Sequence, residues 1–393
     1  MKSDFEERKP SDVRWVPQKF RELLSEPLYT TVILATGVFF LTSIIIHFPI
    51  NNSPQFYSDF LGSFWGRMVG NTQIREVVVG IPYIDYMFEY PPICGLIVWL
   101  GGWASGGSQT VFAAIEFGIL LIFAVLTSHV VYQFLGYLKL GHNRQLIFSV
   151  FAPSLLFYGA YNFDIVQTFF VILSLYLFIA EKKTGWSALA LGLSVATKLS
   201  PAILLPVMLQ ELHDRTSRIR YAVIMGATVA ALNVPFAIAN FSTWLAGYEF
   251  LRSWGLEDSF LVWIFNNSNS WAFAKEISYG LLGLSALAVY VFFRQKPLLV
   301  RAFMLLGLFI LFSYIATPQM NLDLLPLFSV VPMIPLSLFY LYELADVGII
   351  ASWFAFSNST LPGVPQTFAL LRQIYLAVII GILGFSKKSE DIG

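Results

Sequence analysis

Residues 28–49 read LYTTVILATGVFFLTSIIIHFP, and this stretch decides the fold class. It contains no Asp, Glu, Lys or Arg, and it has about the 20 apolar residues that a membrane-spanning helix needs. A cleaved signal peptide has a shorter apolar region and a small-residue cleavage site. We therefore predict that residues 28–49 form the first transmembrane helix. Six basic residues precede it and place residues 1–27 in the cytoplasm: Lys2, Arg8, Lys9, Arg14, Lys19 and Arg21.

The composition of the whole chain supports this prediction. Of the 393 residues, 57% are hydrophobic and only 12% are charged, whereas soluble domains carry roughly 25% charged residues. The formal net charge is zero, so the basic surface of a nucleic-acid binder is missing. The lone Cys94 excludes an internal disulfide and a cysteine metal cluster. These observations exclude a water-soluble globular protein and predict an all-α polytopic membrane protein.

Charge predicts the direction of each crossing. Residues 51–90 hold four carboxylates and two arginines, which places them outside. Basic clusters place later segments inside: Lys139–Arg144, Lys182–Lys183, His213–Arg220, Arg294–Lys296 and Lys387–Lys388. Apolar runs lie near residues 110–137, 145–160, 164–180, 186–198, 201–212, 221–240, 271–293, 299–316, 323–342 and 367–385. We expect about 11–13 transmembrane helices with both termini inside. Because several runs are shorter than a full span, we also expect some of the helices to be broken or tilted.

Two short apolar segments require another interpretation. Between Tyr90 outside and Lys139 inside the chain must cross an odd number of times, yet two apolar segments lie there. Pro91–Ala104 is the shorter, so we predict that it dips into the outer leaflet and returns. We expect a similar short piece at Val347–Phe356. The predicted organisation is one transmembrane domain, 28–385, with an external loop at 51–109 and a cytoplasmic tail at 386–393.

Ionisable residues gather at the predicted external ends of helices, where each is a functional hypothesis. Asp59 lies in the external loop, and Asp85 and Glu89 follow in an aromatic-rich stretch that ends in Pro91-Pro92. An ordinary solvated loop with aromatic anchors at the membrane surface explains each carboxylate equally well. The four histidines are scattered and show no metal-ligand spacing.

Lys198 lies between two short apolar runs on the side where lysines are rare. A snorkelling lysine is the structural alternative, and a cation that binds a phosphate is the functional one. Asn162 and Asp164 begin another helix, where an Asp is usually a cap. Gln319 lies in a turn between two helices. Since these groups converge on one face of the membrane, they predict one site for an anionic substrate.

Five short motifs, in this order along the chain, carry a resemblance to a known family. They are Tyr57-Ser58-Asp59, Glu89-Tyr90-Pro91-Pro92, Asn162-Phe163-Asp164-Ile165-Val166, Thr197-Lys198-Leu199-Ser200-Pro201 and Thr317-Pro318-Gln319, the last followed by Leu324-Leu325-Pro326. The set resembles the polyprenyl-phosphate-mannose-dependent mannosyltransferases of the GT-C superfamily. It is particularly similar to the catalytic subunit of GPI mannosyltransferase I and its prokaryotic relatives. The resemblance runs from about residue 28 to residue 345.

This resemblance implies a GT-C-like helix bundle with short external helices around an outer-leaflet cavity, and a donor sugar carried on a lipid phosphate. Asp59 matches the family's catalytic carboxylate. Tyr57 stands where the animal enzyme has a second acidic residue, so a metal role is not implied and no cofactor is expected. The chemistry assigns donor-phosphate binding to Lys198, helped by Arg75 or Arg252. It assigns sugar and acceptor binding to Tyr57, Asp85, Glu89, Tyr90, Asn162, Asp164 and Gln319.

The expected partners are a polyprenyl-phosphate sugar donor, a lipid or glycan acceptor, membrane lipids and a small membrane partner subunit, with no nucleic acid. We expect a prokaryotic cell membrane with the site facing outward, or the endoplasmic reticulum in a eukaryote. Two alternatives stay open at this point. One is a lipid or sugar transporter or scramblase, whose usual marks are internal repeats and broken helices at the midplane. The other is a non-catalytic subunit of a membrane complex.

Overall fold

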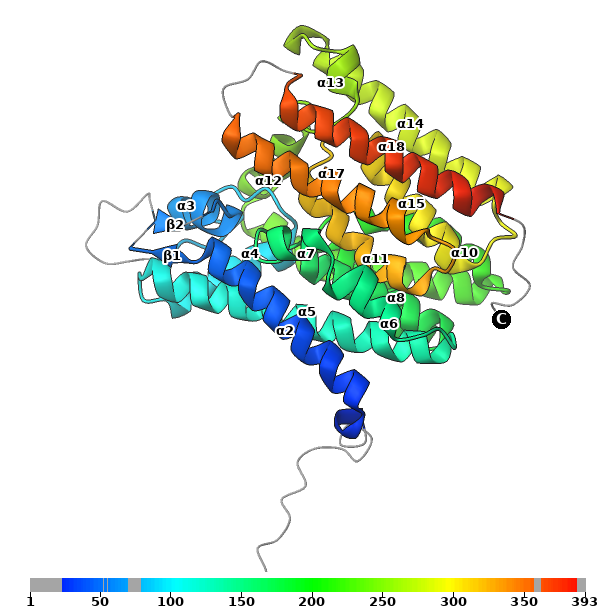
Figure 1. Ribbon diagram of the computed structural model, residues 1–393. Coiled ribbons are helices and arrows are strands. Elements are labelled where there is room, and N and C mark those ends of the chain that lie inside the picture. Colours follow the sequence, from blue (N-terminus) through cyan, green and yellow to red (C-terminus); the bar gives the residue numbers. More distant parts are fainter. Residues whose placement is uncertain (1–22, 52, 55, 70–78, 357–361, 387–393) are drawn as a thin grey trace, which may run out of the picture.

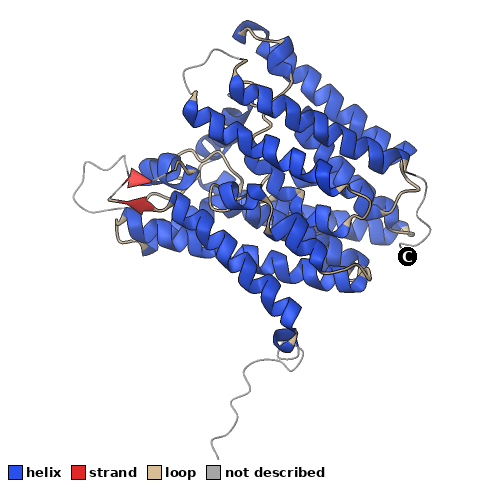
Figure 2. Cartoon of the chain, in the orientation of Figure 1, coloured by secondary structure: helices blue, strands red, loops and turns tan. Residues whose placement is uncertain are grey.

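The structure is a computed structural model that describes residues 23–51, 53–54, 56–69, 79–356 and 362–386. Arg75, the six leading basic residues and Lys387–Lys388 lie outside the described residues. Within these ranges helices dominate, and one two-stranded antiparallel sheet joins β1 (Pro49–Ile50) to β2 (Ser53–Pro54) (Figure 2). The prediction of an all-α polytopic membrane protein is confirmed.

Six helices in the described part of the chain are long and apolar enough to cross a membrane. They are Pro27–His47, Gln109–Tyr137, Arg215–Ala239, Ser268–Phe292, Leu336–Ala355 and Val364–Phe385. Four further apolar helices are shorter: Pro92–Ala104, Asp164–Ile179, Thr184–Val195 and Leu298–Phe312. A span of about 20 residues is needed to cross the hydrocarbon core. The count of 11–13 crossings therefore stays a prediction.

The first half of the chain alternates long helices with short, irregular pieces. Its elements are α2 (Pro27–His47), β1 (Pro49–Ile50), β2 (Ser53–Pro54), η1 (Phe60–Phe64), α3 (Trp65–Val69), α4 (Pro92–Ala104), α5 (Gln109–Tyr137), α6 (Asn143–Gln145), η2 (Leu146–Val150), α7 (Pro153–Tyr158), α8 (Asp164–Ile179) and α9 (Thr184–Val195). The apolar run near 145–160 is broken, as expected, because Pro153 cannot continue the preceding turn. The helix predicted after Pro91 is present as α4, while its return within one leaflet stays a prediction.

The second half contains the other four of the six long helices. Its elements are η3 (Ser200–Leu204), α10 (Leu205–Glu211), α11 (Arg215–Ala239), α12 (Phe241–Ser253), α13 (Leu261–Ile264), η4 (Ser268–Ser270), α14 (Trp271–Phe292), α15 (Leu298–Phe312), η5 (Pro318–Asp323), α16 (Leu325–Val330), α17 (Leu336–Ala355) and α18 (Val364–Phe385). The η elements are 3-10 or π-helical turns. Two of these turns lie at predicted polar residues: Lys198 lies two residues before η3, and Gln319 lies within η5.

One predicted element is wrong. Val347–Phe356 is not a separate short piece, because α17 begins at Leu336 and continues to Ala355. Glu343 does not interrupt this helix, since its carboxylate is buried and hydrogen-bonded inside the bundle. Gly348 lets the Phe368 ring of α18 lie against α17, where a Cβ atom would be 2.4 Å from that ring. Close packing on α18 therefore keeps one continuous helix.

The long helices lie side by side in one bundle (Figure 1). Helix α17 packs along α18, α8 packs along α9, and α5 packs against both α2 and α8. Figure 1 shows β1, β2, α3 and α12 at one end of the bundle and α10 at the other. The elements β1, β2 and α3, which belong to the predicted external loop, therefore share one end of the bundle with α12.

Candidate functional site

Asp59 lies where the first loop meets the start of α8. Its backbone N–H donates to the carbonyl oxygen of Tyr161 at 3.1 Å. The side-chain Nδ2 of Asn162 donates to Asp59 Oδ2 at 2.5 Å and to the Tyr90 hydroxyl at 2.7 Å. Asn162 is completely buried, so this one amide fixes the carboxylate and the phenol relative to each other. Three predicted motifs, far apart in the sequence, therefore meet at Asn162.

Aromatic packing holds this junction in place. Phe60 and Phe64 of η1 lie 4.8 and 5.4 Å, between ring centroids, from Phe163. Aromatic pairs at such distances add stabilisation beyond their buried area. Gly62 allows the Tyr57 ring to fold back onto η1, since a Cβ atom there would lie 2.1 Å from that ring. The turn that carries Asp59 is thus packed tightly against the start of α8.

Lys198 also lies beside Tyr90. Its Nζ atom donates to Asp164 Oδ1 at 2.5 Å and lies 5.3 Å from the centroid of the Tyr90 ring. The Asp164 side chain is 0% exposed and the Lys198 side chain is 12% exposed, so the lysine is the partner that reaches the surface. We call Asp59, Tyr90, Asn162, Asp164 and Lys198 the Asp59 cluster. Lys198 and Asp59 are thus connected through Tyr90 and Asn162.

The start of α4 positions the lysine motif. The Ile93 backbone N–H donates to the carbonyl oxygen of Ala196 at 3.0 Å. The Cys94 thiol donates to the carbonyl oxygen of Thr197 at 3.1 Å. The first turn of a helix has N–H groups without partners in the helix, and here one of them holds the segment before Lys198. The double proline therefore contributes to the site by fixing where α4 begins.

The electrostatics of Asp59 suit a general base. Burial raises the pKa of Asp59 to about 7, while the hydrogen bond from Tyr57 and the charge of Lys198 act to lower this pKa. The charges of Glu89 and Asp164 act in the same direction as burial. A base is most effective when its pKa lies near the working pH. Asp59 therefore holds a carboxylate that can accept a proton near neutral pH.

A second set of hydrogen bonds connects η5 to the cluster. Thr168 Oγ1 donates to Asp323 Oδ1 at 2.9 Å, and Gln167 Nε2 donates to Asp323 Oδ2. The same Gln167 amide donates to Ser200 Oγ at 3.1 Å. Gln167 and Thr168 lie one turn beyond Asp164 on α8. Asp323 was not among the predicted site residues, because an Asp just beyond a turn is commonly a helix cap.

The other two predicted carboxylates have partners of their own. Glu89 is buried and pairs with Arg67 of α3, whose guanidinium lies 5.8 Å from the Phe250 ring centroid. Asp85 is exposed, and its carboxylate accepts a hydrogen bond from the Ile81 backbone N–H at 2.6 Å. Asp85 therefore closes a local turn, and its predicted role in sugar binding gains no support from its position.

The remaining predicted residues are placed as follows. Gln319 is buried in η5, two residues before Asn321. The Tyr57 hydroxyl forms a hydrogen bond with Ser63 Oγ at 2.9 Å. Arg252 is exposed near the end of α12, and the hydrogen bonds of the Asp59 cluster do not include it. Arg75 lies outside the described residues. Arg67, which pairs with Glu89, the residue before Tyr90, is a further cation beside this site.

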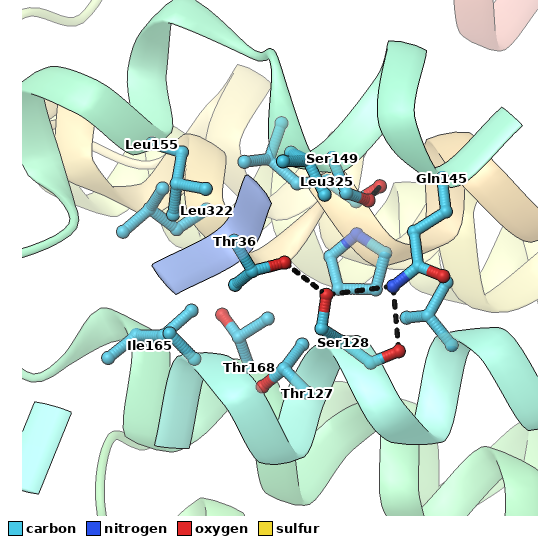
Figure 3. A pocket seen from close by; sticks show the side chains of 14 residues that line it. Thr36, Thr127, Ser128, Gln145, Ser149, Leu155, Ile165, Thr168, Leu322 and Leu325 are labelled. Atoms are coloured by element: carbon cyan, nitrogen blue, oxygen red, sulfur yellow. Dashed lines mark hydrogen bonds between the residues drawn. The ribbon is translucent and has the colours of Figure 1, made fainter. Parts of the chain in front are cut away.

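A separate cavity of about 30 Å³ lies deeper between the helices (Figure 3). Polar side chains line part of it, and Figure 3 shows the Ser128 hydroxyl bonded to Thr36 and to Gln145. Ligand pockets usually measure about 300–1,000 Å³, so this cavity has room for water alone. Thr168 both lines the cavity and bonds to Asp323, which brings the cavity close to the site without making it a sugar pocket.

The described residues contain no group of three His, Cys, Asp or Glu side chains that could hold a metal ion. Comparison with known proteins assigns no family: no family model matches the chain, and no curated protein matches it. The chemical interpretation of the site therefore depends on its own geometry.

Proposed function

We propose that the protein is an integral-membrane glycosyltransferase that moves a sugar from a polyprenyl-phosphate donor to a lipid-linked or glycan acceptor. The acceptor site faces the external side, and mannose is the sugar by family resemblance. One observation carries this proposal. Asn162 and Tyr90 link a carboxylate with a pKa near 7 to a partly exposed lysine, and they do so at a polar junction between membrane helices.

The proposed reaction is an inverting transfer with Asp59 as the base. Asp59 takes the proton of an acceptor hydroxyl while the acceptor oxygen bonds to the anomeric carbon of the sugar. The bond between that carbon and the phosphate oxygen breaks, and polyprenyl phosphate leaves with the electron pair. Such a displacement passes through an oxocarbenium-like state, as glycoside hydrolysis does. A positioned base typically contributes about 10²- to 10⁴-fold in rate.

Lys198 stabilises the charge that develops on the leaving phosphate. An ammonium group has three donors, and Asp164 accepts from one of them. The others remain for phosphate oxygens, in surroundings where a preorganised cation acts strongly. Arg67, paired with Glu89, is the second cation that we assign to this role, in place of Arg252. The apolar helices provide the surface on which the polyprenyl chain lies.

The proposal is tested with purified protein in liposomes that contain radiolabelled polyprenyl-phosphate mannose and extracted lipid acceptors. We expect label to move to the acceptor and polyprenyl phosphate to be released in equal amount. Movement of intact donor between leaflets, without transfer, would instead identify a transporter or scramblase. Because both outcomes are measured in one preparation, the assay separates the proposed enzyme from its strongest alternative.

A further inference from the structure

A second ionic cluster lies inside the bundle, among residues that the sequence motifs did not include. We call Asn321, Glu343, Asp346 and Arg372 the Arg372 cluster; all four side chains are completely buried. Arg372 NH1 donates to Asp346 Oδ1 at 2.9 Å, which forms an ion pair between α18 and α17. Glu343, one turn before Asp346 on α17, accepts from the Asn321 amide at 2.6 Å.

This cluster holds the segment 316–323 at two points. Arg372 NH2 donates to the carbonyl oxygen of Ala316, just before η5 begins. Asn321, within η5, donates to Glu343 at 2.6 Å and to Asp346 Oδ2 at 3.4 Å. The planar guanidinium fixes direction as well as distance, because its two arms bind two separate acceptors. The start and the middle of the segment are therefore both anchored to α17 and α18.

The anchored segment is connected to the Asp59 cluster through the first turns of α8. Asp323 ends η5 and accepts from Gln167 and Thr168, which lie on the first turns of α8. Asp164 begins that helix and pairs with Lys198. A displacement of η5 would therefore move the acceptor that holds this turn of α8. The connection from α18 to the start of α8 thus runs through η5.

We propose that Arg372 and Asp346 are positioning residues of the glycosyltransferase site, and this inference rests on the proposed function. A buried ion pair is weak evidence for stability, since apolar replacements are often neutral or stabilising. Its geometric effect is specific: it fixes η5, and through Asp323 it fixes the start of α8 that carries Asp164. Misplacement of a reacting group by about 1 Å can cost about 10²-fold in rate.

The test compares Arg372→Met and Arg372→Lys with Arg301→Met in the full-length protein. Arg301 is also completely buried, but it pairs with Glu211 at the other end of the bundle, so it is a matched control. Two properties are measured: hydrogen exchange of the backbone amides of residues 316–325, and kcat and donor KM for sugar transfer. Arg372→Lys keeps the buried positive charge and serves if Arg372→Met does not fold.

We expect both Arg372 variants to increase exchange in residues 316–325 and to lower kcat, by up to about 10²-fold for Arg372→Met, with little change in donor KM. Arg372→Lys should show the smaller change, and Arg301→Met should leave both properties as in the wild type. Unchanged exchange and kcat in both Arg372 variants would overturn the inference. So would an equal loss of kcat in Arg301→Met. A wild-type protein that transfers no sugar overturns the proposed function instead, and the exchange data then decide separately whether Arg372 holds η5.

Discussion

The Asp59 cluster and the Arg372 cluster are built from the same kinds of residue, but only the Asp59 cluster is open. Lys198 is 12% exposed and Asp59 is half-buried, whereas Arg372 and Asp346 are completely buried. A charge that a substrate must reach cannot be fully enclosed, and a charge that fixes two helices is best enclosed. An ionisable residue in a membrane bundle therefore indicates chemistry when it retains access, and architecture when it does not.

The largest expected effect concerns the proposed base. Asp59→Asn should lower the rate of transfer by about 10²- to 10⁴-fold, because the amide cannot accept the proton of the acceptor hydroxyl. The variant should fold normally, since an amide oxygen can still accept the hydrogen bond from Asn162. Transfer kinetics and thermal unfolding in detergent check both statements.

Asp85→Asn is the matched control for that experiment. Asp85 is an exposed carboxylate in the same loop, and its contact is a local backbone turn. We expect near-normal transfer from this variant. Equal losses from both substitutions would remove the distinction between Asp59 and an ordinary loop carboxylate.

The next effect tests whether Lys198 acts on the donor or only on Asp164. Lys198→Met leaves a completely buried carboxylate without its cation, and breaking such a buried pair costs about 3–5 kcal/mol. The double variant Lys198→Met/Asp164→Asn should recover most of the stability, because the unpaired charge is gone. It should not recover donor use. If the double variant transfers sugar with normal donor KM, the lysine is a structural partner only.

The pH dependence of transfer should follow Asp59. The base must be deprotonated, so transfer should fall as the pH decreases through about 7, the pKa of Asp59. Tyr57 donates a hydrogen bond that lowers this pKa. Tyr57→Phe should therefore move the acidic limb of the profile of kcat/KM to higher pH. If the acidic limb of Tyr57→Phe stays at the wild-type pH, a group other than Asp59 controls the profile.

The smallest effect compares two arginines. Arg67→Ala should reduce donor use, because it removes the cation paired with the buried Glu89 beside the site. Arg252→Ala, at an exposed position on α12, should change stability by no more than about 0.5 kcal/mol and leave transfer unchanged. Donor KM for the two variants checks this ranking. A larger loss of donor use in Arg252→Ala would return donor binding to Arg252, as predicted from the sequence.

Much of the fold was predictable because apolar runs and basic clusters are local signals. The first helix and the helix after Pro91 both follow from residue type alone. The continuous α17 was missed because Glu343 and Asp346 look like the end of an apolar run. Their partners, on η5 and α18, are invisible in a sequence.

The candidate site was predictable in part for the same reason. Asp59, Asn162 and Lys198 were chosen from motifs, and the structure brings them together. Asp323 and Arg67 were not chosen, because a turn carboxylate and a loop arginine are common. Their significance depends on contacts with residues more than 20 positions away. Contacts of this kind are set by tertiary packing and leave no local pattern.

The proposed mechanism requires Asp59 and Lys198 to act on one phosphosugar. The most direct measurement is a structure of the protein with a non-transferable polyprenyl-phosphate sugar analogue bound. We predict a phosphate oxygen about 2.7–2.9 Å from Lys198 Nζ, with the anomeric carbon facing the side on which Asp59 lies. A phosphate bound away from Lys198, or a sugar separated from Asp59 by Tyr90, would contradict it.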